Sequence, residues 1–161
     1  TASSILTVGV SHLVPAVQDR CRPAPQPEIV SGSCVAAEET ADASATVFRA
    51  DDRGPEEIFS KGFEPKGDNM DLLQHASSNP NDSGYISTSS RLAFAQDWAA
   101  ENGYDYIYKL RATGLDVNAE LGADSPFPYE NEIAVPQSIP GSDIEGVWGL
   151  GGWMDNPGFE P

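Results

Sequence analysis

The sequence predicts an α+β fold assembled from short strands and short helices. Its 161 residues fit one domain, and 13 prolines and 15 glycines indicate a loop-rich chain rather than a helical bundle. Residues 46–50 and 104–110 are rich in β-branched and aromatic side chains, which is typical of strands. Residues 91 to about 102 follow a helical pattern that Gly103 ends.

Short helices and strands alternate through residues 46–161. Pro55 indicates the start of a helix that Gly62 ends, and residues 70–76 indicate a second short helix. Short strands are expected near residues 115–117, over residues 129–136 and over residues 144–148. The glycine-rich tail that follows is expected to be a loop on the surface.

The segment 82–90 places a surplus of hydroxyl groups between a strand and a helix. Residues 85–86 favour a strand, and Ser90 is the N-cap candidate for the helix over residues 91–102. Ser87, Thr88 and Ser89 are then left without a capping role, and buried hydroxyl groups need partners or a ligand. The residues of that helix expected to face the core are Leu92, Phe94, Ala95 and Trp98.

The formal net charge of −16 limits the partners that the protein can bind. Binding to DNA phosphates or to an anionic membrane surface depends on clustered Lys and Arg, so the composition argues against both partners. It does not argue against a small anionic ligand, because one or two buried arginines can outweigh a distant acidic surface. No apolar run approaches the length of a membrane span, so none is expected.

Residues 1–45 are predicted to form an amino-terminal extension that holds both cysteines, Cys21 and Cys34. Their spacing lacks the paired ligands of a zinc site, and no metal is expected. A disulfide is favoured over two free thiols; it would contribute about 3 kcal/mol if unstrained and implies an oxidising compartment. A chain that begins at Thr1 is expected of a secreted protein after signal removal, or of a trimmed chain.

Charged side chains in two strand-like segments are candidates for a functional site. Arg49 lies between apolar residues, and its ordinary interpretation is an ion pair with Asp51 or Asp52. Glu130 and Glu132 are two residues apart, so both are expected on one face of a strand. Such a pair is usually a solvated face, but partly buried like charges raise each other's pKa and suggest a use. With an arginine and ordering hydroxyls, paired carboxylates suit nucleotide-dependent group transfer through an oxocarbenium-like centre.

These motifs resemble those of the cholera-toxin-like arginine mono-ADP-ribosyltransferases, the family of the enzymatic A subunits of cholera toxin and heat-labile enterotoxin. The resemblance covers most of residues 47–148 and rests on Arg49, on the Ser-Thr-Ser run that begins at Ser87, and on Glu130-Asn131-Glu132. It implies two small antiparallel sheets packed around an NAD cleft, with flanking helices. Residues 46–161 would form the catalytic domain, packed as one unit.

The resemblance implies a role for each matching residue. Arg49 would brace the phosphate and ribose of NAD. Ser87 would hydrogen-bond and orient Glu132, which would grip the nicotinamide ribose and stabilise the cation formed as nicotinamide leaves. Glu130 would engage the acceptor guanidinium. His75 would lie near the nicotinamide ribose; its other interpretation is a surface histidine on a small helix.

Thr88 is grouped with the residues that bind NAD, although its place along a strand points it away from Ser87 and suits a structural role. The resemblance implies a secreted, toxin-like enzyme that transfers ADP-ribose to an arginine of a target protein inside a target cell. The delivery subunit is unknown. DNA is not favoured as acceptor, because the guanine-modifying, pierisin-like relatives carry Gln where Glu130 stands. The alternatives are NAD glycohydrolysis or guanine modification on the same fold and, least favoured, a non-catalytic secreted binding module.

Overall fold

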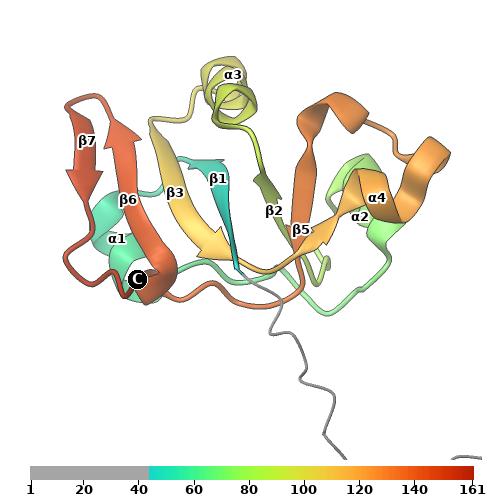
Figure 1. Ribbon diagram of the computed structural model, residues 1–161, viewed down its shortest axis with the longest axis horizontal. Helices are drawn as coiled ribbons and strands as arrows, with labels where there is room; N and C mark the ends of the chain where they lie inside the picture. The colour runs from blue at the N-terminus through green and yellow to red at the C-terminus, as the bar shows by residue number, and fades with distance from the viewer. Residues whose placement is uncertain (1–43) are drawn as a thin grey trace, which may run out of the picture. The chain divides into compact units, whose positions relative to one another are not determined.

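The computed structural model describes residues 44–161, so the Cys21–Cys34 disulfide and nearly all of the predicted extension lie outside the described residues. In this part of the chain seven strands pair antiparallel in one sheet, in the order β4-β5-β2-β1-β3-β6-β7 (Figure 1). The strands are β1 Ala45–Asp51, β2 Ile86–Ser89, β3 Tyr106–Ala112, β4 Leu115–Asp116, β5 Glu132–Val135, β6 Ile144–Gly149 and β7 Gly152–Asp155.

The sheet has two halves that meet at a single residue pair. β1 pairs with β3 along its whole length, whereas β1 and β2 share only the pair of Phe48 with Ser89. Two separate small sheets were expected. The strands instead form one sheet, in which the halves β4-β5-β2 and β1-β3-β6-β7 are joined at this pair. Because pairing stops there, the facing sides of β1 and β2 remain free to line a cleft.

Short helices connect the strands and cover the sheet (Figure 1). Pro55 begins α1 as predicted, and Gly62 follows its last residue with a φ of 73°. Asp71 caps α2 by accepting a hydrogen bond from the amide of Gln74 at 2.9 Å. None of the helices in the described residues is long and apolar enough to cross a membrane. The helices are α1 Pro55–Lys61, α2 Leu72–Ser78, α3 Leu92–Asn102 and α4 Val117–Leu121, with 3-10 turns at Gly122–Asp124, Pro128–Glu130 and Gly141–Asp143.

The start of α3 differs from the prediction. Arg91, not Ser90, occupies the N-cap position, and no side chain caps the helix. The Ser90 hydroxyl instead donates to the carbonyl of Asn131 at 3.3 Å, and the Ser89 hydroxyl accepts from the amide of Arg91 at 3.0 Å. The hydroxyl groups of Ser89 and Ser90 therefore link the end of β2 to the residues just before β5 instead of capping α3.

The buried face of α3 is also different from the one predicted. Ala95 and Ala99 are its buried residues, whereas Leu92 and Phe94 are half-buried and Trp98 is 42% exposed. Ala95 and Ala99 have small side chains, which let α3 pack closely against β1 and β3. The larger aromatic side chains of α3 remain at the surface, near the cleft.

Two other segments differ from their predictions. The glycine-rich tail forms β7, which pairs with β6 from Gly146 to Gly149, so it is an edge strand rather than a loop. The strand expected over residues 129–136 begins only at Glu132, because Pro128–Glu130 is a 3-10 turn and Asn131 adopts a left-handed φ of 48°. Glu130 and Glu132 therefore do not lie on one face of a strand.

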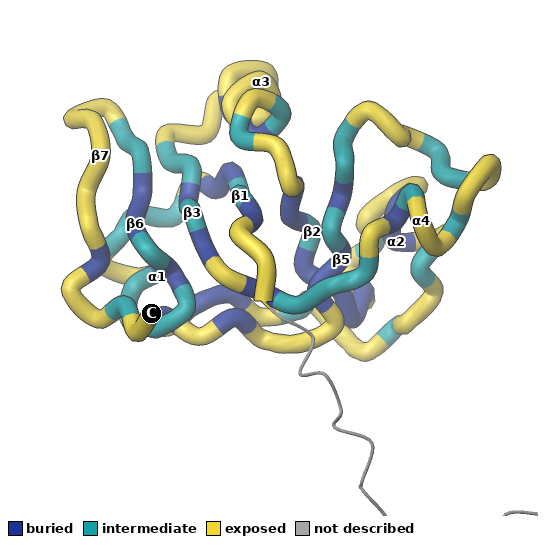
Figure 2. Tube along the Cα trace, in the orientation of Figure 1, coloured by how far each residue is buried: buried dark blue, intermediate teal, exposed yellow. Residues whose placement is uncertain are grey.

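The buried residues, dark blue in Figure 2, form two clusters. The larger cluster packs Ile58 of α1 against Val47, Tyr108 and Leu110 of β1 and β3. The smaller cluster is formed by Ala76 of α2, Tyr85, Val117 of α4 and Ala134 of β5. The larger cluster also includes Ile86 of β2 and Val135 of β5, so it packs across both halves, whereas the smaller cluster lies only on the side of β5, α2 and α4.

Gly62 tests this packing, because an added Cβ there would lie 2.0 Å from the carbonyl oxygen of Ile139. Gly103 is the control for a positive φ after a helix, since it has no atom within 4 Å of an added Cβ; its ψ of 32° is left-handed, whereas that of Gly62 is −156°. We expect Gly103→Ala to destabilise the fold by about 1 kcal/mol through the left-handed backbone alone. Gly62→Ala should cost clearly more in urea unfolding; equal losses for the two variants would contradict the close approach.

Candidate active site

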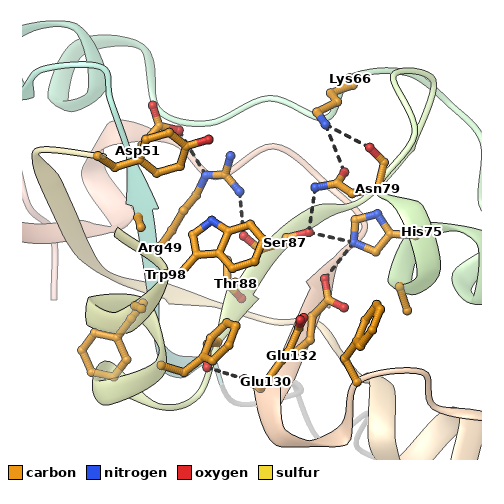
Figure 3. Close-up of a pocket in the computed structure, with 18 of the residues that line it drawn as sticks. Arg49, Asp51, Lys66, His75, Asn79, Ser87, Thr88, Trp98, Glu130 and Glu132 are labelled. Carbon is orange, nitrogen blue, oxygen red and sulfur yellow. Dashed lines mark hydrogen bonds and ion pairs between the residues drawn. The ribbon is translucent and has the colours of Figure 1, made fainter. Parts of the chain in front are cut away.

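A cleft of about 570 Å³ lies where β1 and β2 separate, with α2 and α3 contributing to its walls (Figure 3). This volume is within the range of roughly 300–1,000 Å³ that is usual for small-ligand sites. The predicted site residues all line it: Arg49, His75, Ser87, Thr88, Glu130 and Glu132. Residues that are up to 83 positions apart in the sequence (49 to 132) therefore meet in one cavity.

Arg49 joins the two strands that border the cleft. Its Nη1 donates to the carbonyl oxygen of Ser87 at 2.7 Å, and its Nε donates to Asp51 at 3.3 Å. The Arg49 side chain is 23% exposed, and burial lowers its pKa from the ordinary value, although the charge of Asp51 opposes this shift. An arginine keeps its charge at any physiological pH, so the cleft contains a fixed cation that is held from both strands.

A second arginine shares the carboxylate of Asp51. Arg53 makes three hydrogen bonds to it, from Nε at 2.8 Å, from Nη2 at 2.9 Å and from its main-chain amide at 3.1 Å. Burial alone would raise the pKa of Asp51, but the Arg53 hydrogen bonds and the charge of Arg49 bring it below the ordinary value. Both guanidinium groups also lie over the ring of Phe63, with distances of 5.2 and 5.3 Å to its centroid. The ion pair foreseen for Arg49 exists, and the cation still faces the cleft.

His75 and Glu132 are in direct contact at the base of the cleft. The His75 Nε2 lies 3.1 Å from Glu132 Oε1 and also 3.1 Å from Ser87 Oγ. His75 is 1% exposed and Glu132 is 8% exposed, so a surface histidine is excluded. We expected Ser87 to hydrogen-bond Glu132 directly; the hydrogen bond to Glu132 comes from His75 instead, and the two residues are linked through its ring.

Asn79 extends this network toward the surface. Its Nδ2 donates to Ser87 Oγ at 3.3 Å, while Lys66 Nζ donates to both the side-chain and the main-chain oxygen of Asn79. Asn79 follows α2 with a left-handed φ of 41°, a conformation that asparagine tolerates better than most residues. This asparagine was not singled out from the sequence; its place after a helix and before Pro80 was the available signal.

Thr88 has a structural role in addition to lining the cleft. Its hydroxyl donates to the carbonyl of Ile133 on β5 at 2.7 Å, and the residue is buried. This agrees with the opposite orientation expected for neighbouring residues of a strand. Among the described residues, this is the only side-chain hydrogen bond that Thr88 makes.

Glu130 lies at the opposite rim of the cleft from Arg49, at the end of a 3-10 turn (Figure 3). The turn is held by the Ser89 hydroxyl, which donates to the Glu130 carbonyl at 2.7 Å. Burial, and to a lesser extent the charge of Glu132, raise the pKa of the Glu130 carboxyl to about 7. The charge of Glu132 thus raises the pKa of Glu130, although the chain does not place the two carboxylates on one strand face.

Aromatic side chains line part of the cleft, among them Phe94, Trp98 and Phe127, a feature that sequence reasoning missed. The rings of Trp98 and Phe94 have centroids 6.1 Å apart, those of Phe94 and Tyr129 6.3 Å, and those of Tyr129 and Phe127 6.2 Å. Trp98, Phe127 and Tyr129 are all exposed. Phe127 and Tyr129 lie close to Glu130 in the sequence, and this was the available signal. Trp98 had instead been assigned to the core.

Comparison with known proteins places the chain in a family. The Scabin-like family profile matches residues 47–154, which is more than half of the sequence. This chain belongs to the Scabin-like family. A heat-labile enterotoxin IIB A chain from Escherichia coli is 38% identical over 123 residues, covering 62% of this chain and 46% of the enterotoxin chain. A guanine-specific ADP-ribosyl transferase from Streptomyces coelicolor is 32% identical over 105 residues, covering 63% and 50%.

A solved member of the Scabin-like family has the same fold. Scabin toxin from Streptomyces scabies, in complex with NADH, is 28% identical with a TM-score of 0.64, covering 76% of this chain and 82% of that one. The predicted ADP-ribosyltransferase fold and the resemblance to toxin A chains are therefore confirmed. The chain spans about half the length of the two sequence relatives described.

The raised pKa of Glu130 can be measured directly. We expect the carbon-13 signal of its carboxyl to titrate with a midpoint near pH 7, the value that burial and Glu132 impose. Glu132→Gln should lower that midpoint by removing one negative charge, but it should stay above the ordinary value because burial is the larger cause. A midpoint unaffected by Glu132→Gln, or one already ordinary in the wild type, would contradict this account.

Proposed function

We propose that this protein is a secreted, toxin-like, NAD-dependent mono-ADP-ribosyltransferase that modifies arginine in a target protein. The observation that carries the proposal is the cleft itself, which combines a fixed cation on one side with two carboxylates of different environments on the other. Family membership supports the reaction class, and a family member was solved with NADH. Secretion and action inside a target cell rest on the similarity to enterotoxin A chains.

The chemical groups in the cleft suit NAD. Arg49 supplies a guanidinium, which matches the geometry of phosphate oxygens, and Arg53 lies beside it. The ring of Trp98 offers an aromatic face, and the Glu132 carboxylate offers acceptors for ribose hydroxyl groups. In the reaction the bond between ribose and nicotinamide breaks, its electrons leave with nicotinamide, and a new bond forms to the acceptor nitrogen.

In this proposal Glu132 stabilises positive charge on the ribose. It is buried, and it accepts a hydrogen bond from His75 that fixes the orientation of its carboxylate. A preorganised carboxylate in a site with little water stabilises a developing cation without reorganising during the reaction. Ser87, which contacts the same histidine, maintains this arrangement from β2.

In this proposal Glu130 receives the acceptor. It lies at the rim, is only half-buried and has a pKa of about 7. A carboxylate with such a pKa can attract a guanidinium and can also take up the proton that the attacking nitrogen releases at neutral pH. The exposed rings beside it give an acceptor side chain an apolar surface to contact.

Guanine is the second candidate acceptor, because a relative is a guanine-specific ADP-ribosyl transferase. A glutamate at position 130 and a net charge of −16 favour a cationic acceptor over a polyanion such as DNA. Free guanine nucleosides carry no such penalty and are included in the test. Water as acceptor would give NAD glycohydrolysis.

The proposed division of roles can be tested with labelled NAD. We expect label to be transferred to an arginine-containing protein, and Glu130→Gln to reduce transfer about 100-fold or more while nicotinamide release without transfer continues. Glu132→Gln should abolish both reactions. Asp52→Asn, which removes an exposed carboxylate that also lines the cleft, is the matched control and should change neither much.

The products of the same assay decide between acceptors. ADP-ribose alone would indicate a glycohydrolase, and an adduct on guanosine would indicate the guanine-modifying reaction. An equal loss of transfer and nicotinamide release in Glu130→Gln would contradict the acceptor role of Glu130. A protein that neither cleaves NAD nor melts at a higher temperature in excess NAD would be a binding module of another kind.

A further inference from the structure

Ser83 is a fully buried serine behind the site, on the far side of the His75 ring from Glu132. It is 0% exposed and lies in the loop before β2. Its Oγ is 2.7 Å from His75 Nδ1, the shortest side-chain contact of that ring. The ring thus has one nitrogen facing Ser83 and the other facing both Glu132 and Ser87.

The hydrogen bonds of Ser83 determine which way its hydroxyl proton points. The amide of Tyr85 donates to Ser83 Oγ at 3.2 Å, so the oxygen already acts as an acceptor there. A hydroxyl group has one proton to donate, and a buried donor without an acceptor is costly. The only other hydrogen-bond partner that the described residues give this oxygen is His75 Nδ1. Ser83 therefore donates to Nδ1, which must carry no proton.

The opposite nitrogen leads to the same assignment independently. Glu132 Oε1 lies 3.1 Å from His75 Nε2, and a carboxylate oxygen needs a donor at that distance. An Nε2 without a proton would bring two lone pairs together in a buried site. Nε2 therefore carries the proton, and both ends of the ring specify the same neutral imidazole.

We propose that Ser83 is a positioning residue that holds His75 as the neutral, Nε2-protonated imidazole and thereby directs its proton at Glu132 and Ser87. The inference rests on the proposed function for its catalytic meaning, but the state of the ring is a property of the folded chain alone. Because the Ser83 hydroxyl donates to Nδ1, that nitrogen has no room for a second ring proton. A second proton would turn the ring into an imidazolium beside Glu132. That cation would offset the negative charge needed at the ribose.

The same arrangement sets the direction of the Ser87 hydroxyl. Ser87 Oγ faces the Nε2 proton at 3.1 Å and accepts from Asn79 Nδ2 at 3.3 Å, so both of its nearby partners are donors. Its own proton is then free to point into the cleft, where Ser87 is half-buried. Ser83 thus makes Ser87 a hydrogen-bond donor toward a bound ligand. In the other neutral form of the ring, with the proton on Nδ1, Nε2 would instead accept the Ser87 proton.

The ring state can be read from nitrogen-15 NMR of the full chain labelled at histidine. The sequence has two histidines, so His12→Gln leaves a single imidazole to assign. We expect a pyrrole-type signal for Nε2 and a pyridine-type signal for Nδ1, shifted by its hydrogen bond. A protonated Nδ1 at neutral pH, in either a neutral ring or an imidazolium, would overturn the proposal. This spectrum decides the matter even if a Ser83 variant fails to fold.

Ser83→Ala tests the consequence, with Ser142→Ala as a control at a half-buried serine outside the cleft. Ser83→Ala should move the Nδ1 signal to that of a nitrogen without a hydrogen bond and lower kcat for NAD cleavage about tenfold, with little change in KM. Ser142→Ala should alter neither. A folded Ser83→Ala protein with an unchanged Nδ1 signal or unchanged kcat would overturn the proposal. A wild type without NAD cleavage would refute the proposed function while the spectrum still tests Ser83.

Discussion

The hydrogen bond from Arg49 to the Ser87 carbonyl is the interaction on which the site depends. β1 and β2 share one residue pair, so the sheet is nearly divided where the cleft opens. The guanidinium spans that division at 2.7 Å and places the cation between the two strands. Asp51 and Arg53 restrain the same group from behind. The charge that suits a phosphate is therefore also a structural link, and an uncharged side chain would weaken both functions.

The two carboxylates of the E-x-E motif differ because the backbone separates their surroundings. A 3-10 turn and a left-handed Asn131 place Glu130 at the rim, whereas Glu132 begins β5 and is buried against His75. Burial and one neighbouring charge then bring the pKa of Glu130 to about 7. Two glutamates only two residues apart thus have two different environments, which a regular strand with both groups on one face would not allow.

The sequence predicted the α+β class, most elements and six of the residues that line the cleft. Those predictions rested on local composition and on motifs that resemble a known family. The errors came from tertiary contacts: Ser90 bonds to Asn131 instead of capping α3, and Ala95 packs inward while Trp98 faces the cleft. The contact of His75 with Glu132 joins residues 57 positions apart, and no pattern in the sequence specifies such a bond.

We propose that NAD binds in this cleft between Arg49 and Glu132. A crystal structure of the protein with NADH, whose dihydronicotinamide is a poor leaving group, would test this binding mode. We expect phosphate oxygens within hydrogen-bond distance of the Arg49 guanidinium and a nicotinamide-ribose hydroxyl within hydrogen-bond distance of Glu132. Dinucleotide bound elsewhere, or bound in the cleft with its nicotinamide ribose away from Glu132, would contradict it.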